Sequence, residues 1–473
     1  MQLILIVHLS IAMLASELSG VLPIGPAWGL AILGLAPALA VATGAWMNRA
    51  AQRGMDRQDQ SGIERAFASS ARIGACVALV MLVASGTELP VKVDGTLGHL
   101  ATIVLFLGVA VSSTLAHHAM LYPIERRLRE ARLMRSLDSG APVHPTPTRG
   151  AYLLARARAS MVPLLAPILI MLALGEGARL VALRVAPGSA DAIRVAGSAA
   201  GVLCLFVLFP LLVPFLLGLR RLEPGPIRSD LEEMAASAGV GVREIWVWPT
   251  DGLIANAAVV GMLPGLRCVM FSDGLLEGMS RRHIRAVMAH ELGHVVRRHM
   301  LWLAVVLVAL GLVVMAAVEP LASEVCERLA VGADGDAQRL IKRVVSISTD
   351  VSIFAIAITL FGYASRRFER QADTFAVQLM SRSAGRDDAT SAAVDDMCEA
   401  LRMIAYLNHV PVARGSWRHG SIAWRMRYLR LLDGAPLASM WIDRQIALIC
   451  WGSAAIVAAA AALELNALEF MAP

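Results

Sequence analysis

The chain of 473 residues is 57% hydrophobic and only 17% charged, with a formal net charge of +6. Soluble globular proteins average about 45–50% apolar and roughly 25% charged residues, so this composition excludes an ordinary soluble enzyme and predicts a membrane protein. The positive charge comes almost wholly from arginine, and no basic patch is interleaved with aromatic residues, which excludes a nucleic-acid-binding protein.

The first predicted elements are membrane-spanning helices, each of which needs about 20 mostly apolar residues. Stretches of this kind cover residues 3–22, 27–46, 71–87, 99–118, 160–177, 196–219, 301–318, 347–364 and 443–463. The connections 47–70 and 119–158 are rich in arginine, whereas the connection 88–98 carries only Lys92. Positively charged loops face the cytoplasm, so we expect the N-terminus on the cytoplasmic side.

This pattern divides the chain into five segments. They are N-terminal transmembrane helices with basic cytoplasmic loops at 1–219, a catalytic segment at 220–300, a transmembrane hairpin at 301–364, a second catalytic segment at 365–440 and a C-terminal transmembrane helix within 441–473. The two ends of a helical hairpin return to one membrane face. Residues of the two catalytic segments can therefore meet, and the count of spans places both in the cytoplasm.

The catalytic segment 220–300 differs in character from the spans. Short runs of β-forming residues predict strands at 242–248, 257–260 and 268–271. Ser280 predicts the start of a long helix that carries His283 to His299 and runs on into the next span. We expect His283 and His299 to be solvated or interfacial.

The motif that carries chemistry is His290-Glu291-Leu292-Gly293-His294. Residues four apart lie on one face of a helix, so His290 and His294 can offer imidazole nitrogens to one metal ion. Zinc favours such ligands, and Glu291 beside the first histidine is placed to act as general base. The small Gly293 lets another element approach this helix.

A catalytic zinc site needs a third protein ligand. Glu369 is the candidate, because it follows the 347–364 span at the same membrane face as His290. Asp373 lies one helical turn further on and can fix the tautomer of a ligating histidine through a hydrogen bond. The scattered cysteines offer no recognisable zinc spacing.

The HELGH motif followed by Ser365-Arg366-Arg367-Phe368-Glu369-Arg370-Gln371-Ala372-Asp373 resembles the M48 metallopeptidases, among them the Ste24 CAAX prenyl proteases and the HtpX heat-shock membrane proteases. The resemblance covers roughly 225–430. It implies that Glu369 is the third zinc ligand and that Asp373 supports a ligating histidine.

Two further stretches fit the same resemblance. Asn256, Ala257 and Ala258 occupy the place of an Asn-Ala stretch and edge strand that binds an extended substrate. The pair His419 and Arg425 fits a C-terminal histidine followed six residues later by arginine, with an implied role in holding the substrate carbonyl or oxyanion. The chain departs from the family at Ala258, where an aromatic residue is usual, and at Gly420, where proline is usual.

We therefore expect a mainly α, polytopic helical membrane protein with a small α+β gluzincin-type zinc peptidase domain. The expected activity is that of a zinc metalloendopeptidase with one Zn²⁺ per chain. It would hydrolyse membrane-associated or misfolded proteins or peptides at the cytoplasmic face of a membrane. The use of arginine in place of lysine is typical of GC-rich genomes and indicates a bacterium, so we expect this membrane to be a bacterial inner membrane. The expected partners are a peptide or protein substrate and the lipid bilayer; the sequence does not indicate an oligomeric state.

Four alternatives remain open. The first is CAAX-type processing of a prenylated peptide, and the second is a catalytically idle, zinc-stabilised scaffold, which the intact Glu291 disfavours. The third is a signal-transducing protease, for which a sizeable external domain is missing. The fourth is a transporter, which would require charges at mid-membrane, where Glu17 is the best candidate.

Overall fold

The computed structural model describes residues 24–59, 70–87, 96–139, 144–252, 254–408, 410–438 and 440–471, with a few single positions before residue 24. The chain forms two compact units, Met1–Leu205 and Phe206–Pro473. The predicted span 3–22 lies largely outside the described residues, and so does its Glu17.

The first unit consists of helices. They are α2 (Pro26–Asp56), α4 (Ser70–Ser85), α5 (Thr96–Ser139), α6 (Arg149–Ser160), α7 (Val162–Val185), the short 3₁₀ turn η1 (Pro187–Ser189) and most of α8 (Ala190–Leu217). Small residues on α2 let α5 come close: a Cβ added at Gly44 would lie 2.9 Å from the Cβ of Met120. Close packing over small residues is typical of helices in a bilayer.

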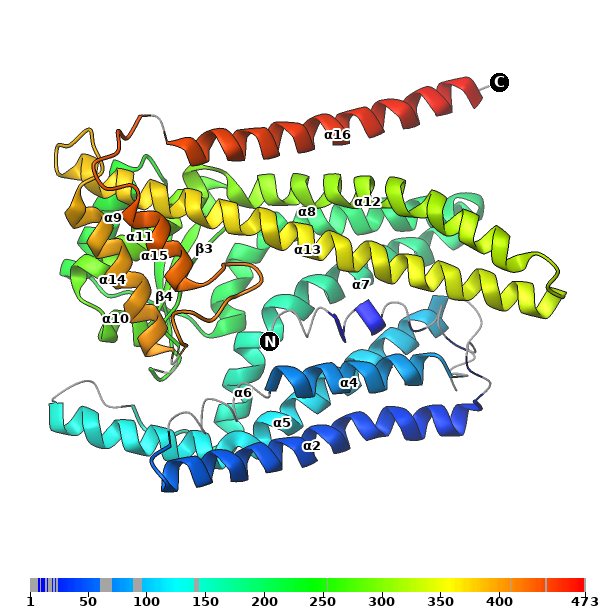
Figure 1. Cartoon of the computed structure of the whole chain (residues 1–473), viewed down its shortest axis with the longest axis horizontal. Coiled ribbons are helices and arrows are strands. Elements are labelled where there is room, and N and C mark those ends of the chain that lie inside the picture. Colours follow the sequence, from blue (N-terminus) through cyan, green and yellow to red (C-terminus); the bar gives the residue numbers. More distant parts are fainter. Residues whose placement is uncertain are drawn as a thin grey trace. The chain divides into compact units, whose positions relative to one another are not determined.

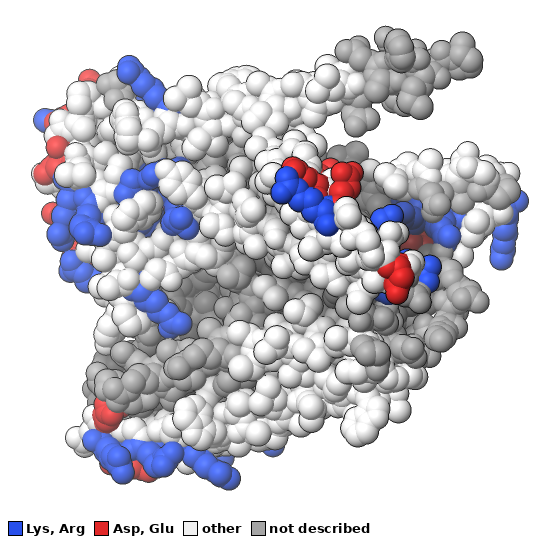
Figure 2. Space-filling model, turned by 45° about the vertical axis from the view of Figure 1, so that its right-hand side comes forward, with Lys and Arg blue, Asp and Glu red and all other residues white. Residues whose placement is uncertain are grey.

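Six helices of the described chain are long and apolar enough to cross a membrane: Pro26–Asp56, Ala101–Ala131, Leu165–Val185, His299–Ala330, Ala337–Ser383 and Trp441–Leu463. Six of the predicted spans fall on them. The predicted spans 71–87 and 196–219 coincide with the shorter apolar helices Gly74–Ser85 and Val207–Leu217. Figure 2 shows wide uncharged stretches of surface between groups of charged side chains. The prediction of a polytopic helical membrane protein is confirmed.

The second unit contains a four-stranded sheet in the order β1-β2-β4-β3. The strands are β1 (Arg220–Arg221), β2 (Glu244–Trp248), β3 (Ala257–Val260) and β4 (Cys268–Ser272). β2 and β4 are parallel, and β3 pairs antiparallel with β4 at one edge of the sheet. The three predicted strands are present, whereas the two-residue β1 was not predicted from the sequence.

The helices of this unit are α9 (Pro226–Ser237), α10 (Asp273–Gly278), α11 (Arg281–Val296), α12 (His299–Ala330), α13 (Gly335–Ser383), α14 (Ser391–Leu407), α15 (Ile422–Arg430) and α16 (Trp441–Met471), with the 3₁₀ turn η2 (Pro264–Leu266). In Figure 1 the long helices α12 and α13 run side by side, and the sheet with α9, α11, α14 and α15 gathers at one end of this hairpin. The last turns of α13 therefore lie inside the domain, whose core includes Phe271, Met288 and Phe368.

The expectation of one continuous helix through His299 is wrong. α11 ends at Val296 and α12 begins at His299, because Arg298 between them adopts a left-handed backbone with φ +53°. The expectation that His283 and His299 are solvated or interfacial is also wrong, since both side chains are buried.

Candidate metal centre

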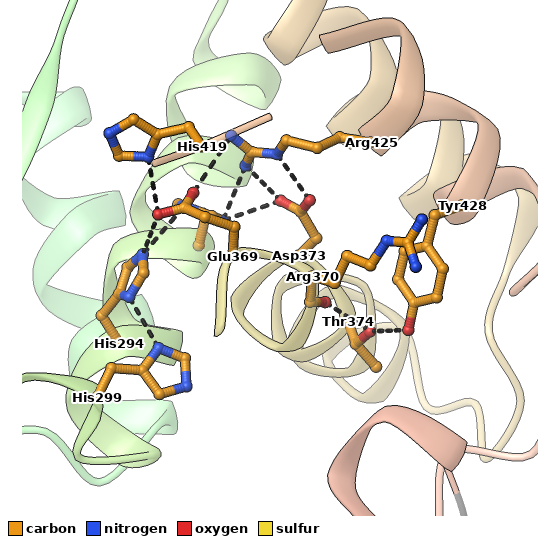
Figure 3. A network of polar contacts seen from close by, with 10 residues as sticks. His294, His299, Glu369, Arg370, Asp373, Thr374, His419, Arg425 and Tyr428 are labelled. Atoms are coloured by element: carbon orange, nitrogen blue, oxygen red, sulfur yellow. Dashed lines mark hydrogen bonds and ion pairs between the residues drawn. The ribbon is translucent and has the colours of Figure 1, made fainter. Parts of the chain in front are cut away.

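Three potential metal ligands converge from two helices. α11 carries His290 and His294 one turn apart, and α13 carries Glu369. Figure 3 shows His294 pointing toward Glu369. One ligand atom of each lies within 4.8 Å of the others, and no other such group of three occurs among the described residues. The two Nε2 atoms are 3.2 Å apart, and they lie 3.6 Å and 3.9 Å from carboxylate oxygens of Glu369.

Gly293 permits this convergence, because it lies where α11 meets α13. A Cβ added at Gly293 would stand 3.1 Å from Cα and 3.2 Å from the carbonyl oxygen of Ala372. Ala372 is three residues beyond Glu369, so the close approach of the two backbones sets the distance between the histidines and the glutamate.

The outer nitrogen of His290 is held by a carboxylate. Nδ1 lies 3.0 Å from Oδ1 of the fully buried Asp373. Arg425 on α15 donates to the same carboxylate through Nε at 2.8 Å and an NH2 group at 2.6 Å. Since an ionised carboxylate only accepts, Nδ1 carries the hydrogen and Nε2 presents its lone pair toward His294 and Glu369.

Burial lowers the pKa of His290, but the hydrogen bond to Asp373 and the negative charges of Asp373 and Glu369 together outweigh burial and raise that pKa. Binding of a metal ion at Nε2 therefore competes with protonation of this nitrogen. The pKa of the neighbouring His294 is lowered well below its ordinary value, chiefly by burial, which keeps that imidazole neutral and able to ligate.

The outer nitrogen of His294 contacts His299, which the sequence predicted to be solvated or interfacial. His294 Nδ1 lies 2.8 Å from His299 Nδ1, and His299 Nε2 lies 2.9 Å from the amide oxygen of Gln371. On a continuous helix, residues five apart point about 140° away from each other. The break at Arg298 turns His299 back onto His294, so spacing alone could not have identified it.

Glu291 lies beside the edge strand β3. Its carboxylate accepts a hydrogen bond from the Val259 backbone, and burial raises its pKa to about 7, against the lowering effect of His290. In an antiparallel strand the outward-facing backbone groups alternate, so Ala257 shares the outward orientation of Val259 and Ala258 faces its partner Met270 on β4. Asn256 has an exposed side chain and donates its backbone N–H to Ser272 Oγ at 2.9 Å.

His419 and Arg425 also reach the site. The half-exposed His419 places Nδ1 2.8 Å from Oε1 of Glu369, and Arg425 NH1 lies 3.3 Å from Oε2 (Figure 3). Burial lowers the pKa of Arg425, but Asp373 and Glu369 outweigh it and raise that pKa. The contacts of Arg425 with two buried carboxylates favour a role in holding them.

The loop that carries His419 explains the departure from proline at Gly420. Gly420 has φ +74°, and it exchanges two backbone hydrogen bonds of 3.0 Å with Ser416. Proline fixes φ near −65° and has no N–H to donate, so it cannot occupy this turn.

Comparisons with known proteins show which family this domain resembles. The sequence model of peptidase family M48 matches residues 222–430, which contain every residue of the candidate metal centre. Residues 222–430 belong to peptidase family M48. The prediction of the family is thereby confirmed, and the site lies within an M48 domain.

Among the relatives, protease HtpX of Pseudomonas putida (strain GB-1) is 31% identical over 156 residues, which are 33% of this chain and 52% of that protein. Protease HtpX of Acinetobacter baylyi is 26% identical over 175 residues, 35% of this chain and 58% of that protein. The chain thus spans about half the length of the curated relatives it matches. The crystal structure of S. mikatae Ste24p aligns with a TM-score of 0.47 and 16% identity over 86% of this chain and 100% of that one.

Proposed function

We propose that this protein is a membrane-embedded, zinc-dependent endopeptidase. The observation that carries the proposal is the position of Glu291, which lies near the convergent His290, His294 and Glu369 and also bonds to the edge strand β3. Two imidazole nitrogens and one carboxylate oxygen are the donor set of a catalytic zinc site that leaves a position open. Zinc bound there would supply Lewis-acid polarisation of a substrate carbonyl and activation of water.

The chain's own residues would then act as follows. An extended substrate adds to β3 through the outward backbone groups of Ala257 and the outward carbonyl of Val259, whose N–H is donated to Glu291. Asn256 stands at the start of the strand, and this pairing places a peptide bond beside Glu291. The Glu291 carboxylate takes a proton from the attacking water and passes it to the leaving amine. A raised pKa of about 7 suits a group that must both accept and release a proton near neutral pH.

His419 is the donor for the oxyanion. Its side chain is 47% exposed and lies 2.8 Å from Glu369, so it can turn toward a carbonyl oxygen. Arg425 and Asp373 act behind the ligands: Asp373 fixes His290, and Arg425 neutralises the two buried carboxylates. The proposed location is a bacterial inner membrane, with the domain in the cytoplasm.

The substrate class is a membrane-associated or misfolded protein or peptide. Protease HtpX, which is 31% identical to this chain over 156 residues, supports peptide-bond hydrolysis. CAAX-type processing of a prenylated peptide is the alternative substrate class. A catalytically idle scaffold is disfavoured, because a purely structural zinc has no use for Glu291 beside a strand edge.

The test is cleavage of casein, an unfolded protein, by the detergent-purified full chain and by Glu291→Gln, each with and without a zinc chelator. We expect cleavage by the wild type alone, abolished by the chelator, with one zinc per chain in both proteins. Zinc binding without cleavage of casein or of a set of membrane-protein substrates by the wild type would favour the scaffold, and absence of zinc binding would refute the metal site.

A further inference from the structure

A hydrogen-bonded chain leads from the metal centre to the C-terminal helix. It starts at His294 on α11 and passes through His299 on α12 and Gln371 on α13 to Asp443 on α16. The successive contacts are 2.8 Å between the two histidine Nδ1 atoms, 2.9 Å from His299 Nε2 to Gln371 Oε1, and 2.6 Å from Gln371 Nε2 to Asp443 Oδ1. Arg297 donates to the other oxygen of Asp443 at 3.2 Å.

The carboxylate of Asp443 determines which partner donates in each of these hydrogen bonds. The Asp443 carboxylate, paired with Arg297, only accepts, so Gln371 must point its NH2 group at Asp443 and its oxygen at His299. That amide oxygen only accepts, so His299 Nε2 carries a hydrogen. His299 is 1% exposed and packs edge-on against Phe368, which favours the neutral ring with a lone pair on Nδ1.

His294 completes the sequence. Two facing nitrogens 2.8 Å apart need one hydrogen between them, so His294 Nδ1 donates to His299 Nδ1. The lone pair of His294 then sits on Nε2, the atom that faces His290 and Glu369. With the opposite tautomer, a hydrogen on Nε2 would block ligation.

The two ligating histidines are therefore supported from different parts of the chain. Asp373 and Arg425, which support His290, lie within the M48 segment 222–430. The support of His294 ends at Asp443, beyond that segment and near the start of α16. The burial of Gln371, which is 4% exposed, makes a missing partner costly, because an unsatisfied buried donor or acceptor loses its hydration without compensation.

We propose that His299, Gln371 and Asp443 are positioning residues that hold His294 in its Nδ1–H tautomer, so that α16 forms part of the metal centre. The proposal rests on the proposed zinc site at His290, His294 and Glu369. Loss of hydrogen-bonded partners behind metal ligands typically costs about 10- to 100-fold in metal affinity.

The test measures zinc affinity, by competition with a chromophoric chelator, for full-length chains that all carry Glu291→Gln so that proteolysis plays no part. Gln371→Leu and Asp443→Ala each interrupt the series of hydrogen bonds from His294 to Asp443. Asp443→Asn keeps an acceptor oxygen for Gln371 and serves as the conservative rescue. Gln378→Leu is the matched control, since Gln378 is also a buried glutamine on α13 but donates to the Leu437 carbonyl at 2.8 Å. It touches the network only through a long contact of 3.4 Å from Arg297 NH2 to its Oε1.

We expect Gln371→Leu and Asp443→Ala to weaken zinc binding about 10- to 100-fold, while Asp443→Asn and Gln378→Leu stay within about threefold of the parent. The cobalt-substituted Gln371→Leu protein should show an altered absorption spectrum, which a purely structural loss would leave unchanged. Parental zinc affinity in Gln371→Leu, or an equal loss in Gln378→Leu, would overturn the positioning role. A parent that binds no zinc would instead refute the metal site itself.

Discussion

Gly293→Ala tests whether the approach of α11 to α13 determines the metal site. The added Cβ would lie 3.1 Å from Ala372 Cα and 3.2 Å from both the Ala372 oxygen and Phe375 Cβ. Ordinary contacts begin near 3.4 Å, so α13 must move by 0.3 Å or more from α11. Metal–ligand distances tolerate only about 0.2 Å, and overpacking costs about 1–3 kcal/mol. If this strain is relieved by moving Glu369 away from the histidines, zinc affinity falls about 5- to 150-fold.

The assay is the competition titration with a chelator, performed on the purified full chain. Gly311→Ala on α12 is the matched control, because no atom lies within 4 Å of its added Cβ and the residue is also helical. Zinc binding and casein cleavage by Gly293→Ala at the level of Gly311→Ala would refute the reasoning, since it would mean that the helices absorb the Cβ without displacing Glu369.

Three other perturbations give separate expectations. In the metal-free protein the pKa of Glu291 is raised from 4.5 to about 7, so the folded state holds this proton more tightly than the unfolded state and loses stability as pH rises between these values. At pH 8 the free energy of unfolding of metal-free Glu291→Gln should therefore exceed that of the metal-free wild type by up to about 3 kcal/mol, and its melting temperature should be higher. At pH 4 the two should melt at about the same temperature, and equal melting at both pH values would contradict the burial of the charge. Asn408 holds the backbone of Ala255 through bonds of 3.0 Å and 2.8 Å, next to Asn256, so Asn408→Ala should raise KM for casein about tenfold with zinc content unchanged, and loss of zinc would disprove a role limited to the strand. Gly420→Ala introduces a side chain at φ +74° and 3.0 Å from Trp424, so kcat should fall about tenfold or more through displacement of His419, whereas wild-type kcat would show that this loop is not part of the site.

Local spacing predicted much of the fold and of the candidate site. The i, i+4 relation placed His290 and His294 on one face of α11, and the hairpin argument brought Glu369 to the same end of the molecule. The strands also followed from short β-forming runs bounded by turns. Each of these inferences depends on residues close in sequence or on a hairpin whose ends must meet.

The parts that the sequence did not predict depend on tertiary contacts. His299 was missed because a helix was assumed to continue through Arg298, whose left-handed φ has no clear signal in an Arg-Arg pair. Gln371 and Asp443 were missed because nothing in the spacing between α13 and α16 indicates that a glutamine on one faces an aspartate on the other. Arg425 was identified through the family, but its pairing with Asp373 required the position of α15.

The arrangement of α13 explains how one membrane helix serves both histidines. Glu369 and Asp373 are four residues apart and share the face toward His290 and Arg425, whereas Gln371 lies about 200° around the helix from Glu369 and faces α12 and α16. A shift of α13 along its axis would therefore change the third ligand and the supports of both imidazoles together. Because α13 is one continuous helix from Gly335 to Ser383, a displacement of its membrane-spanning part also displaces the residues that it contributes to the metal centre. The proposed metal centre is thus a property of the helical hairpin and α16 as much as of the M48 domain.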